Sequence, residues 1–250
     1  MQFPVLLPNI FNYPFTYSSK TKLNVGDYVR VPFGKTIITG VIWNEFEKKK
    51  YKKFKIKKII KKLNIEPLKI DTIKFLNWFS DYNLVPKGMC LKLHLLKGEN
   101  TSLFDKKEYE KYYKKYKKTD FNLSSDQNKI LKELLKNSKN FRVHLLQGTT
   151  GSGKTIIYFK AIEDKLNKGL QALILLPEIG LTGEFEKKFK EFFGFDAAVW
   201  HSGITPKKKK IIWHGLATGN IKVVIGARSS LFLPFKKLGV VIVDEEHDQS

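Results

Sequence analysis

Short runs of apolar residues separated by turn residues occupy the first part of the chain. Strands are expected at residues 5–7, 28–32 and 36–43, because Gly26-Asp27 and Gly34 mark turns before the second and third runs. Apolar residues close to helical spacing predict a helix over 70–82. Between 47 and 63, apolar residues interrupt a lysine run at spacings that fit either a strand or a helix. The pattern predicts a small β-rich domain over residues 1–97.

A charged segment with few aliphatic side chains follows at residues 98–122. Such a segment cannot bury a core of its own, which predicts a linker between two domains. Its tyrosines at 109, 112, 113 and 116 could stack on nucleic acid bases or could belong to a solvated, partly helical connector.

Strand and helix patterns alternate over residues 123–250. Strands are expected at 141–147, 172–176, 197–201, 222–226 and 240–244, and helices at 154–167, at 181–193 and from 206 to about 219. This alternation is typical of an α/β domain around a mostly parallel sheet.

The composition is that of a globular protein with a large excess of positive charge. The 250 residues are 42% hydrophobic and 28% charged, which excludes disordered, collagenous and fibrous classes. Lys and Arg number 46 against 24 Asp and Glu, a net charge of +22, which favours a polyanionic partner such as nucleic acid. Only Arg30, Arg142 and Arg228 are arginines, so a lysine-biased genome is an alternative source of the charge.

Cysteine content and hydropathy narrow the class further. Cys90 is the only cysteine, which excludes an internal disulfide and a cysteine-based zinc site within these residues. No apolar run approaches the roughly 18 residues of a membrane span, and the start of the chain lacks the features of a signal peptide. A cytoplasmic protein without a membrane partner is expected.

A phosphate-binding loop is the strongest chemical signal. Residues 148–155 match the pattern G-x-x-x-x-G-K-[ST] between a predicted strand and a predicted helix, and the candidate nucleotide ligands are Gly148, Thr149, Thr150, Gly151, Ser152, Gly153, Lys154 and Thr155. The glycines let successive N–H groups turn toward a triphosphate. Lys154 would neutralise the β and γ phosphates, and the Thr155 hydroxyl would complete the shell of a Mg²⁺ ion. The loop predicts ATP and Mg²⁺ as cofactors.

Two carboxylates follow a buried strand about ninety residues later. The run at 240–243 delivers Asp244 and Glu245 to the carboxyl end of the sheet, where open α/β sheets bind ligands. Asp244 suits the Mg²⁺ ion, and Glu245 suits deprotonating the water that attacks the γ phosphate. Lys154, Asp244 and Glu245 are therefore the candidate catalytic residues.

These elements and the strings around them resemble a known family. LLQGTTGSGKTIIY, ALILLPEIGLTGEF, VWHSGIT and VVIVDEEHDQS, with LPNIFNYPFTY and VGDYVRVPFGKTIITGVIWN near the start, are similar to the DEAH-like helicases of superfamily 2 and, among them, to the bacterial replication restart helicases. The resemblance is collinear over both domains. It implies a RecA-like first helicase lobe, preceded by a domain that binds the 3′ end of a nascent strand, and an ATP-dependent 3′ to 5′ DNA helicase.

In the motor domain the resemblance assigns roles by position. Gln127 falls where the family reads adenine. Thr182, Arg228 and Ser229 match motifs that contact the phosphates of the tracked strand, and His247 matches the position that couples the nucleotide site to DNA. An exposed position at a helix start is the alternative for Gln127.

In the first domain the resemblance implies a pocket for the 3′ end. Phe15 would offer a stacking face, Gly34 a close backbone approach and Lys57 a charge for phosphate. Thr16 stands where the family has an acidic pocket residue, which weakens the case for binding of a 3′ end. A core position for Phe15 is the alternative.

Other features depart from the family pattern. Family members carry a winged-helix domain between the two domains, where this chain has the linker, and Glu184 replaces a glutamine. The family's second RecA-like lobe, with its arginine finger, and its zinc-binding cysteines are expected beyond residue 250, so little ATP hydrolysis is expected from these residues alone. The implied partners are forked or single-stranded DNA and primosome and replisome-loading proteins, in a nucleoid-associated cytoplasmic setting. A non-catalytic DNA-binding fragment and a motor acting on RNA or in a restriction complex are the alternatives.

Overall fold

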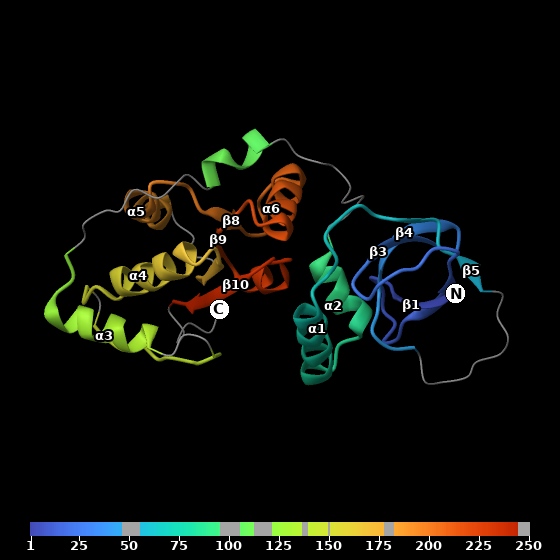
Figure 1. The fold of residues 1–250 in the computed structure, drawn as a ribbon, viewed down its shortest axis with the longest axis horizontal. Coiled ribbons are helices and arrows are strands. Elements are labelled where there is room, and N and C mark those ends of the chain that lie inside the picture. The colour runs from blue at the N-terminus through green and yellow to red at the C-terminus, as the bar shows by residue number, and fades with distance from the viewer. Residues whose placement is uncertain are drawn as a thin grey trace. The chain divides into compact units, whose positions relative to one another are not determined.

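The chain forms two compact units, drawn in Figure 1. This computed structural model describes residues 1–46, 56–95, 106–112, 122–136, 140–149, 151–177 and 183–244. The first unit comprises Met1–Phe104, Pro206–Thr218 and Phe232–Pro234, and the second comprises Asp105–Thr205, Gly219–Leu231 and Phe235–Ser250. The chain therefore passes between the units more than once.

A six-stranded sheet in the order β5-β2-β1-β4-β3-β6 is the centre of the first unit. Its strands are β1 (Gln2–Leu6), β2 (Phe15–Ser18), β3 (Tyr28–Phe33), β4 (Thr36–Ile42), β5 (Lys57–Lys58) and β6 (Lys61–Lys62). Neighbours are antiparallel except β2 and β5, which are parallel. The strands predicted at 5–7, 28–32 and 36–43 are confirmed with small shifts. Residues 47–55 lie outside the described part of the lysine-rich stretch, and its remainder contributes β5 and β6.

Alternation of apolar side chains gives this sheet its core. The buried cluster is Val5, Leu7, Tyr17, Leu23, Val29, Val31 and Ile42. Gly34 has φ +59° in the tight turn between β3 and β4, a conformation that favours glycine. The turn therefore fixes the register in which β3 and β4 pair.

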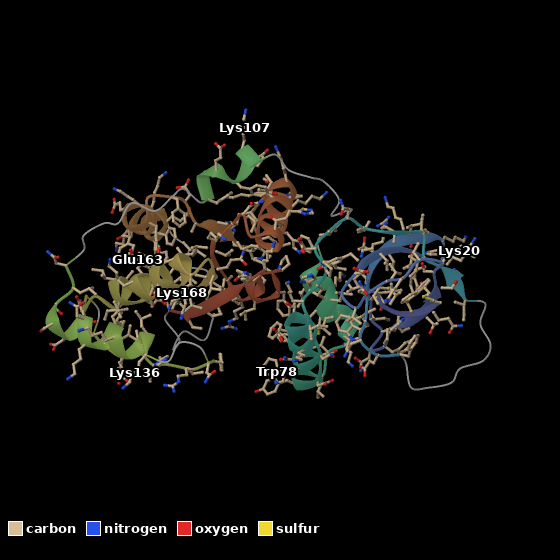
Figure 2. The ribbon with its side chains drawn as sticks, viewed as in Figure 1. Lys20, Trp78, Lys107, Lys136, Glu163 and Lys168 are labelled. Atoms are coloured by element: carbon tan, nitrogen blue, oxygen red, sulfur yellow. The ribbon has the colours of Figure 1, made fainter. Side chains whose placement is uncertain are left out.

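Two helices follow the sheet in sequence. The helix α1 (Ile70–Asn83) confirms the prediction at 70–82, and it ends at Leu84, whose φ of +54° is left-handed. Its buried face carries Ile73, Leu76 and Ser80, whereas Trp78, which contributed to the apolar pattern, is 55% exposed (Figure 2). The helix α2 (Lys87–His94), which the pattern did not predict, begins after Pro86.

A buried aromatic cluster completes the first unit. His94, at the end of α2, is 1% exposed, and its Nδ1–H donates to the carbonyl oxygen of Phe232 at 2.7 Å. Its Nε2 accepts from the Tyr28 hydroxyl at 2.7 Å. Trp213 lies in α6 (Pro206–Thr218), and its indole N–H donates to the His94 carbonyl oxygen at 2.9 Å. Segments far apart in sequence thus meet around one imidazole within this unit.

The second unit contains a parallel sheet of four strands in the order β10-β7-β9-β8. The strands are β7 (Gln171–Leu175), β8 (Ala198–Trp200), β9 (Val223–Gly226) and β10 (Leu238–Val243). Its helices are α3 (Ser125–Leu135), α4 (Lys154–Asn167), α5 (Gly183–Phe193) and the 3₁₀ helices η1 (Lys106–Tyr112) and η3 (Arg228–Phe232). The predicted α/β fold with a parallel sheet is confirmed.

Phenylalanines join α4 and α5 to this sheet. Phe159 of α4 makes ring contacts with Phe189, Phe192 and Phe193 of α5 at centroid distances of 5.2–5.7 Å. All four rings belong to the same buried cluster as Ile174 and other strand residues. This packing fixes α4 against the sheet, which matters because α4 begins at the phosphate-binding loop.

The prediction of a strand at residues 141–147 is wrong. Residues 140–149 have no regular secondary structure, and Phe141, Val143 and Leu145 are 92%, 83% and 85% exposed. The alternation of apolar and polar residues fits a strand locally, but a strand exists only where another strand accepts its hydrogen bonds. None of the described ladders includes this segment.

The described part of the predicted linker packs into the second unit. In η1, Tyr109 and Tyr112 are 7% and 3% exposed, and the Lys111 carbonyl oxygen accepts from the backbone N–H of Asp196 at 2.9 Å. These two rings are therefore not available for base stacking. The alternative prediction, a solvated connector, is also wrong for Tyr109 and Tyr112. Tyr113 and Tyr116 lie outside the described residues.

Candidate functional site

The phosphate-binding loop leads directly into α4. Gly153 is the N-cap with φ +84°, Gly151 has φ +81°, and Lys154 is the first helical residue. No side chain caps this helix end, so its first N–H groups remain oriented toward a ligand. Thr155 is half-buried in the same turn. Thr150 lies outside the described residues.

The Lys154 ammonium group folds back onto the loop. Its Nζ donates to the carbonyl oxygens of Gly148 at 2.6 Å and Thr149 at 3.1 Å. A further loop contact joins the backbone N–H of Ser152 to the Thr149 carbonyl at 3.2 Å. A bound triphosphate would offer the ammonium stronger, charged acceptors in place of these carbonyls.

Gln127 lies beside the loop. It belongs to a capping box at the start of α3, in which its Oε1 accepts from the Ser124 backbone N–H at 3.0 Å and its own N–H donates to Ser124 Oγ at 3.2 Å. Its Nε2 donates to the carbonyl oxygen of Ser152 at 3.3 Å. Glycine is favoured at Gly153 by its positive φ, and a Cβ there would displace the Gln127 amide from its contact with the loop. The structure thus brings Gln127 and the phosphate-binding loop together.

Asp244 follows the last residue of β10. Its backbone N–H donates to the Leu175 carbonyl of β7 at 3.0 Å, and its Oδ2 accepts from the Tyr158 hydroxyl of α4 at 2.8 Å. The sequence did not single out Tyr158, although its position four residues after Lys154 places both on one face of α4. Glu245 and His247 lie outside the described residues.

Of the predicted strand-tracking residues, Arg228 and Ser229 begin η3 and both are exposed. The next residue, Ser230, is buried, and its hydroxyl donates to the Ala227 carbonyl at 2.6 Å, which fixes the turn that presents its two neighbours. Thr182 lies outside the described residues, whereas Glu184 lies in the first turn of α5. A hydrogen bond from Lys188 and its positive charge hold the pKa of Glu184 below its usual range.

Phe15 lies in a cluster of four aromatic side chains in the first unit. Its ring contacts Phe11, Tyr13 and Phe33 at centroid distances of 5.3–5.4 Å. Gly34 directly follows Phe33, and a Cβ there would meet nothing within 4 Å. The structure therefore brings Phe15 and the turn at Gly34 together, with Phe15 half-buried rather than fully exposed.

Lys57 lies on the strand beside Phe15. In β5 it pairs with Tyr17 of β2, two residues from Phe15, and its side chain is exposed. Thr16 is also exposed. Lys57 and Phe15 therefore lie on paired, neighbouring strands of the sheet.

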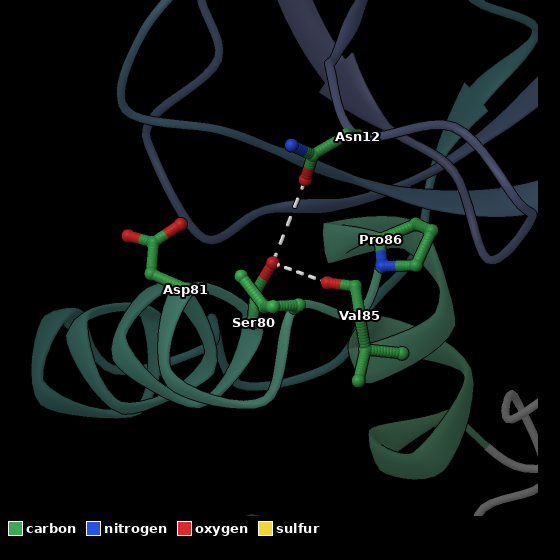
Figure 3. A pocket seen from close by; sticks show the side chains of 6 residues that line it. Asn12, Ser80, Asp81, Val85 and Pro86 are labelled. Carbon is green, nitrogen blue, oxygen red and sulfur yellow. Dashed lines mark hydrogen bonds between the residues drawn. The ribbon is translucent and has the colours of Figure 1, made fainter.

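A separate pocket of about 320 Å³ lies in the first unit (Figure 3). It is lined by Asn12, Ser80, Asp81, Leu84, Val85 and Pro86. The Ser80 hydroxyl donates to the Val85 carbonyl at 2.6 Å, and Asn12 Oδ1 accepts from the Lys87 backbone N–H at 3.0 Å. None of the predicted nucleotide or DNA ligands lines this pocket.

Within the described residues, no helix is long and apolar enough to cross a membrane, and no cluster of three or more His, Cys, Asp or Glu side chains could hold a metal ion. A Mg²⁺ site built from Thr155 and Asp244 contains only one such side chain, because phosphate oxygens would supply the remaining ligands. Hydroxyl and carboxylate oxygens are nevertheless the ligands that Mg²⁺ prefers, so the donor set fits this ion.

A phosphate-binding loop at the start of a helix, together with an aspartate directly after a strand of the parallel sheet, defines a P-loop nucleotide-binding lobe. Residues 124–250 match the family model of the DEAD/DEAH box helicases, and residues 4–95 match that of a 3′ DNA-binding domain. The first match covers half of the chain, and the chain belongs to the DEAD/DEAH box helicase family. Membership implies the use of ATP and Mg²⁺ in general.

The individual relatives are replication restart proteins. PriA of Rickettsia conorii is 38% identical over 248 residues, which are 98% of this chain and 37% of that protein. PriA of Helicobacter pylori strain J99 is 35% identical over 244 residues, 95% of this chain and 36% of that protein. PriA of Bacillus subtilis is 40% identical over 154 residues, 58% of this chain and 19% of that protein. The resemblance to the N-terminal portion of the replication restart helicases is confirmed, and the chain spans little more than a third of the length of the Rickettsia and Helicobacter proteins.

Proposed function

We propose that this chain carries the 3′-end-binding and ATP-binding parts of an ATP-dependent 3′ to 5′ DNA helicase that acts in replication restart. The observation that carries the proposal is the placement of Lys154 at the head of α4 and of Asp244 at the end of β10 within one unit, with α4 in contact with β10. The collinear similarity to PriA, named a replication restart protein, supports the assignment to restart.

In the nucleotide site, each group has a distinct task. The loop N–H groups and Lys154 bind the phosphates, and Gln127 reads the adenine edge with the amide that now bonds Ser152. Thr155 and Asp244 hold Mg²⁺, which when bound neutralises phosphate charge. Glu245 orients and deprotonates the attacking water. His247 couples this site to DNA.

In the DNA sites, phosphate and base contacts are divided between the two units. Arg228, Ser229 and Thr182 hold the phosphates of the tracked strand. Phe15, Gly34 and Lys57 form the pocket for the 3′ end, with the half-buried Phe15 ring already oriented by its aromatic neighbours. The physiological substrate is a forked or single-stranded DNA.

For the wider setting we propose what a role in replication restart would involve. Primosome and replisome-loading proteins are the partners, and the protein works at the nucleoid in the cytoplasm. In sequence, the proposed domains remain 1–97, 98–122 and 123–250, although η1 of the middle stretch packs into the second unit and α6 into the first. The part of PriA that this chain does not span would supply the second lobe, its arginine finger and the zinc site.

The test is nucleotide binding and turnover by the chain and by Lys154→Ala. A fluorescent ATP analogue is titrated with Mg²⁺ present, and ATPase activity is measured with and without forked DNA. Binding should fall at least tenfold in Lys154→Ala. Lys168→Ala is the matched control, because Lys168 lies at the other end of α4, where it pairs with Asp164, and its loss should leave nucleotide binding unchanged (Figure 2).

The outcomes separate the helicase from a DNA-binding fragment. DNA-stimulated turnover that requires Lys154 supports the helicase. Salt-sensitive DNA binding without any nucleotide binding refutes it and leaves a non-catalytic module. For the first unit, equal affinity for forks ending in a 3′ hydroxyl and in a 3′ phosphate would refute binding of the 3′ end.

A further inference from the structure

The Asp244 carboxylate is held by a side chain from the helix that begins at the phosphate-binding loop. The Tyr158 hydroxyl donates to Asp244 Oδ2 at 2.8 Å, and the Asp244 backbone N–H is fixed separately by the Leu175 carbonyl at 3.0 Å. The main chain of Asp244 is thus anchored by β7, whereas a hydrogen bond from α4 constrains its carboxylate.

Tyr158 is itself held rigidly. It is 5% exposed, belongs to the buried cluster of the second unit, and its ring contacts Phe159 edge-on at 5.3 Å. It lies three residues after Thr155 and four after Lys154, so the three side chains share one face of α4. A rotation of the Tyr158 ring would require repacking of the core.

We propose that Tyr158 is a positioning residue for Mg²⁺ binding at the nucleotide site. This inference rests on the proposed function, since it assumes that Asp244 and Thr155 hold the ion. A carboxylate turns readily about its Cβ–Cγ bond, and a hydrogen bond to Oδ2 restricts that rotation. It thereby constrains the direction in which the carboxylate faces the ion or a water bound to it. Hydrogen-bond partners of metal ligands commonly orient them in this way.

A hydroxyl deletion tests this role while keeping the ring. Tyr158→Phe should raise the Mg²⁺ concentration that half-saturates binding of a fluorescent ATP analogue by roughly tenfold or more, because the loss of such a partner typically costs 10–100-fold in metal affinity. Affinity for the analogue in EDTA should equal that of the wild-type chain, since the phosphate-binding loop and Lys154 are untouched.

Tyr17→Phe is the matched control. Tyr17 is 4% exposed, and its hydroxyl donates to the Pro32 carbonyl at 3.0 Å in the first unit. The same atom is removed from an equally buried ring that has no part in the nucleotide site. Its Mg²⁺ midpoint should be that of the wild-type chain.

A double-mutant cycle shows whether Tyr158 acts through Asp244. Asp244→Asn removes the anionic ligand, so adding Tyr158→Phe to it should shift the Mg²⁺ midpoint by less than twofold if both changes act on one contact. Thermal unfolding of each variant identifies any variant that does not fold. If one is unstable, the cycle is repeated with Mn²⁺ at a lower temperature and read from the variants that fold.

Each result decides between the proposals. The positioning role is supported if Tyr158→Phe shifts the Mg²⁺ midpoint tenfold or more, leaves analogue affinity in EDTA unchanged, and shifts the midpoint by less than twofold when added to Asp244→Asn. An unchanged midpoint, or an equal loss of affinity with and without Mg²⁺, overturns it while the nucleotide site stands. A wild-type chain that binds no ATP analogue at all overturns the proposed function and this inference together.

Discussion

Acid should destabilise the first unit through His94. The imidazole is buried between the Tyr28 hydroxyl and the Phe232 carbonyl oxygen, and burial lowers its pKa from 6.5 to about 4, although the hydrogen bond to Phe232 acts in the opposite direction. In the unfolded chain the ring has its ordinary pKa. Between pH 6.5 and pH 4 the unfolded state therefore binds the proton more readily, and the contribution of His94 to stability is lost as the pH falls.

The magnitude follows from the two pKa values. The difference between 6.5 and about 4 corresponds to at most about 3 kcal/mol, of which about 2 kcal/mol is lost between pH 7 and pH 5. Protonation would also turn Nε2 from an acceptor into a donor, so the proton of the Tyr28 hydroxyl would lose its partner. A buried hydroxyl proton without an acceptor is one physical reason why protonating the folded protein costs free energy.

The assay is urea unfolding at pH 7 and pH 5 for the wild-type chain and His94→Asn. The asparagine amide can still donate to Phe232, but the side chain does not titrate. Its free energy of unfolding should therefore fall by about 2 kcal/mol less than that of the wild type between the two pH values. His201→Asn is the control, since His201 is half-buried and its Nδ1 accepts from the Gly203 N–H at 3.1 Å in the second unit. Equal pH dependence in wild type and His94→Asn would refute the reasoning.

Three further predictions concern the first unit. Lys62→Met should lower the free energy of unfolding in urea by about 1–3 kcal/mol, because it leaves the fully buried Asp27 carboxylate without the ammonium group now 2.7 Å away. Lys61→Met, at the exposed neighbouring residue, is the control and should change the free energy of unfolding by less than about 0.5 kcal/mol. Equal effects of the two substitutions would contradict the role of the ion pair. Gly26→Ala should lower the melting temperature, since φ is +92° and the new Cβ would strike a backbone carbonyl, and an unchanged melting curve would count against the turn as described. Cys90 is buried with its thiol pKa raised chiefly by that burial, so it should react with a thiol reagent only after denaturant is added; rapid reaction in the native chain would show that the site opens.

The phosphate-binding helix shows what local sequence can predict. The helix predicted at 154–167 is the observed α4, because Gly153 and Gly169 bracket it and the motif fixes its first residue. The candidate nucleotide residues come from the same motif, since the geometry proposed for them depends on glycine spacing. The parallel strands β7 and β9 were recognisable because buried strands are continuous apolar runs. The run at 240–243 also forms a strand, but the expectation that it is buried is wrong, because β10 is an edge strand of the described sheet with Val241 and Val243 41% and 55% exposed.

Features that depend on long-range pairing could not be predicted in this way. The segment at 141–147 has the alternation of a strand, yet no described strand pairs with it. The hydroxyl of Tyr158 reaches an aspartate 86 residues away, and no local signal marks that contact. His94 likewise meets a carbonyl 138 residues away, so its burial is invisible to a reading of α2 alone.

The helix α6 belongs to the first unit, so the structural units do not coincide with the family domains defined by sequence. This helix and Phe232 lie, in sequence, inside the stretch that matches the helicase family, yet Trp213 and the Phe232 carbonyl bond to His94 of the 3′ DNA-binding region. A recombination event at residue 104 would therefore place His94 against covering groups from a different sequence. Residues that line this cluster are therefore expected to vary together across relatives, even though they fall in different family domains.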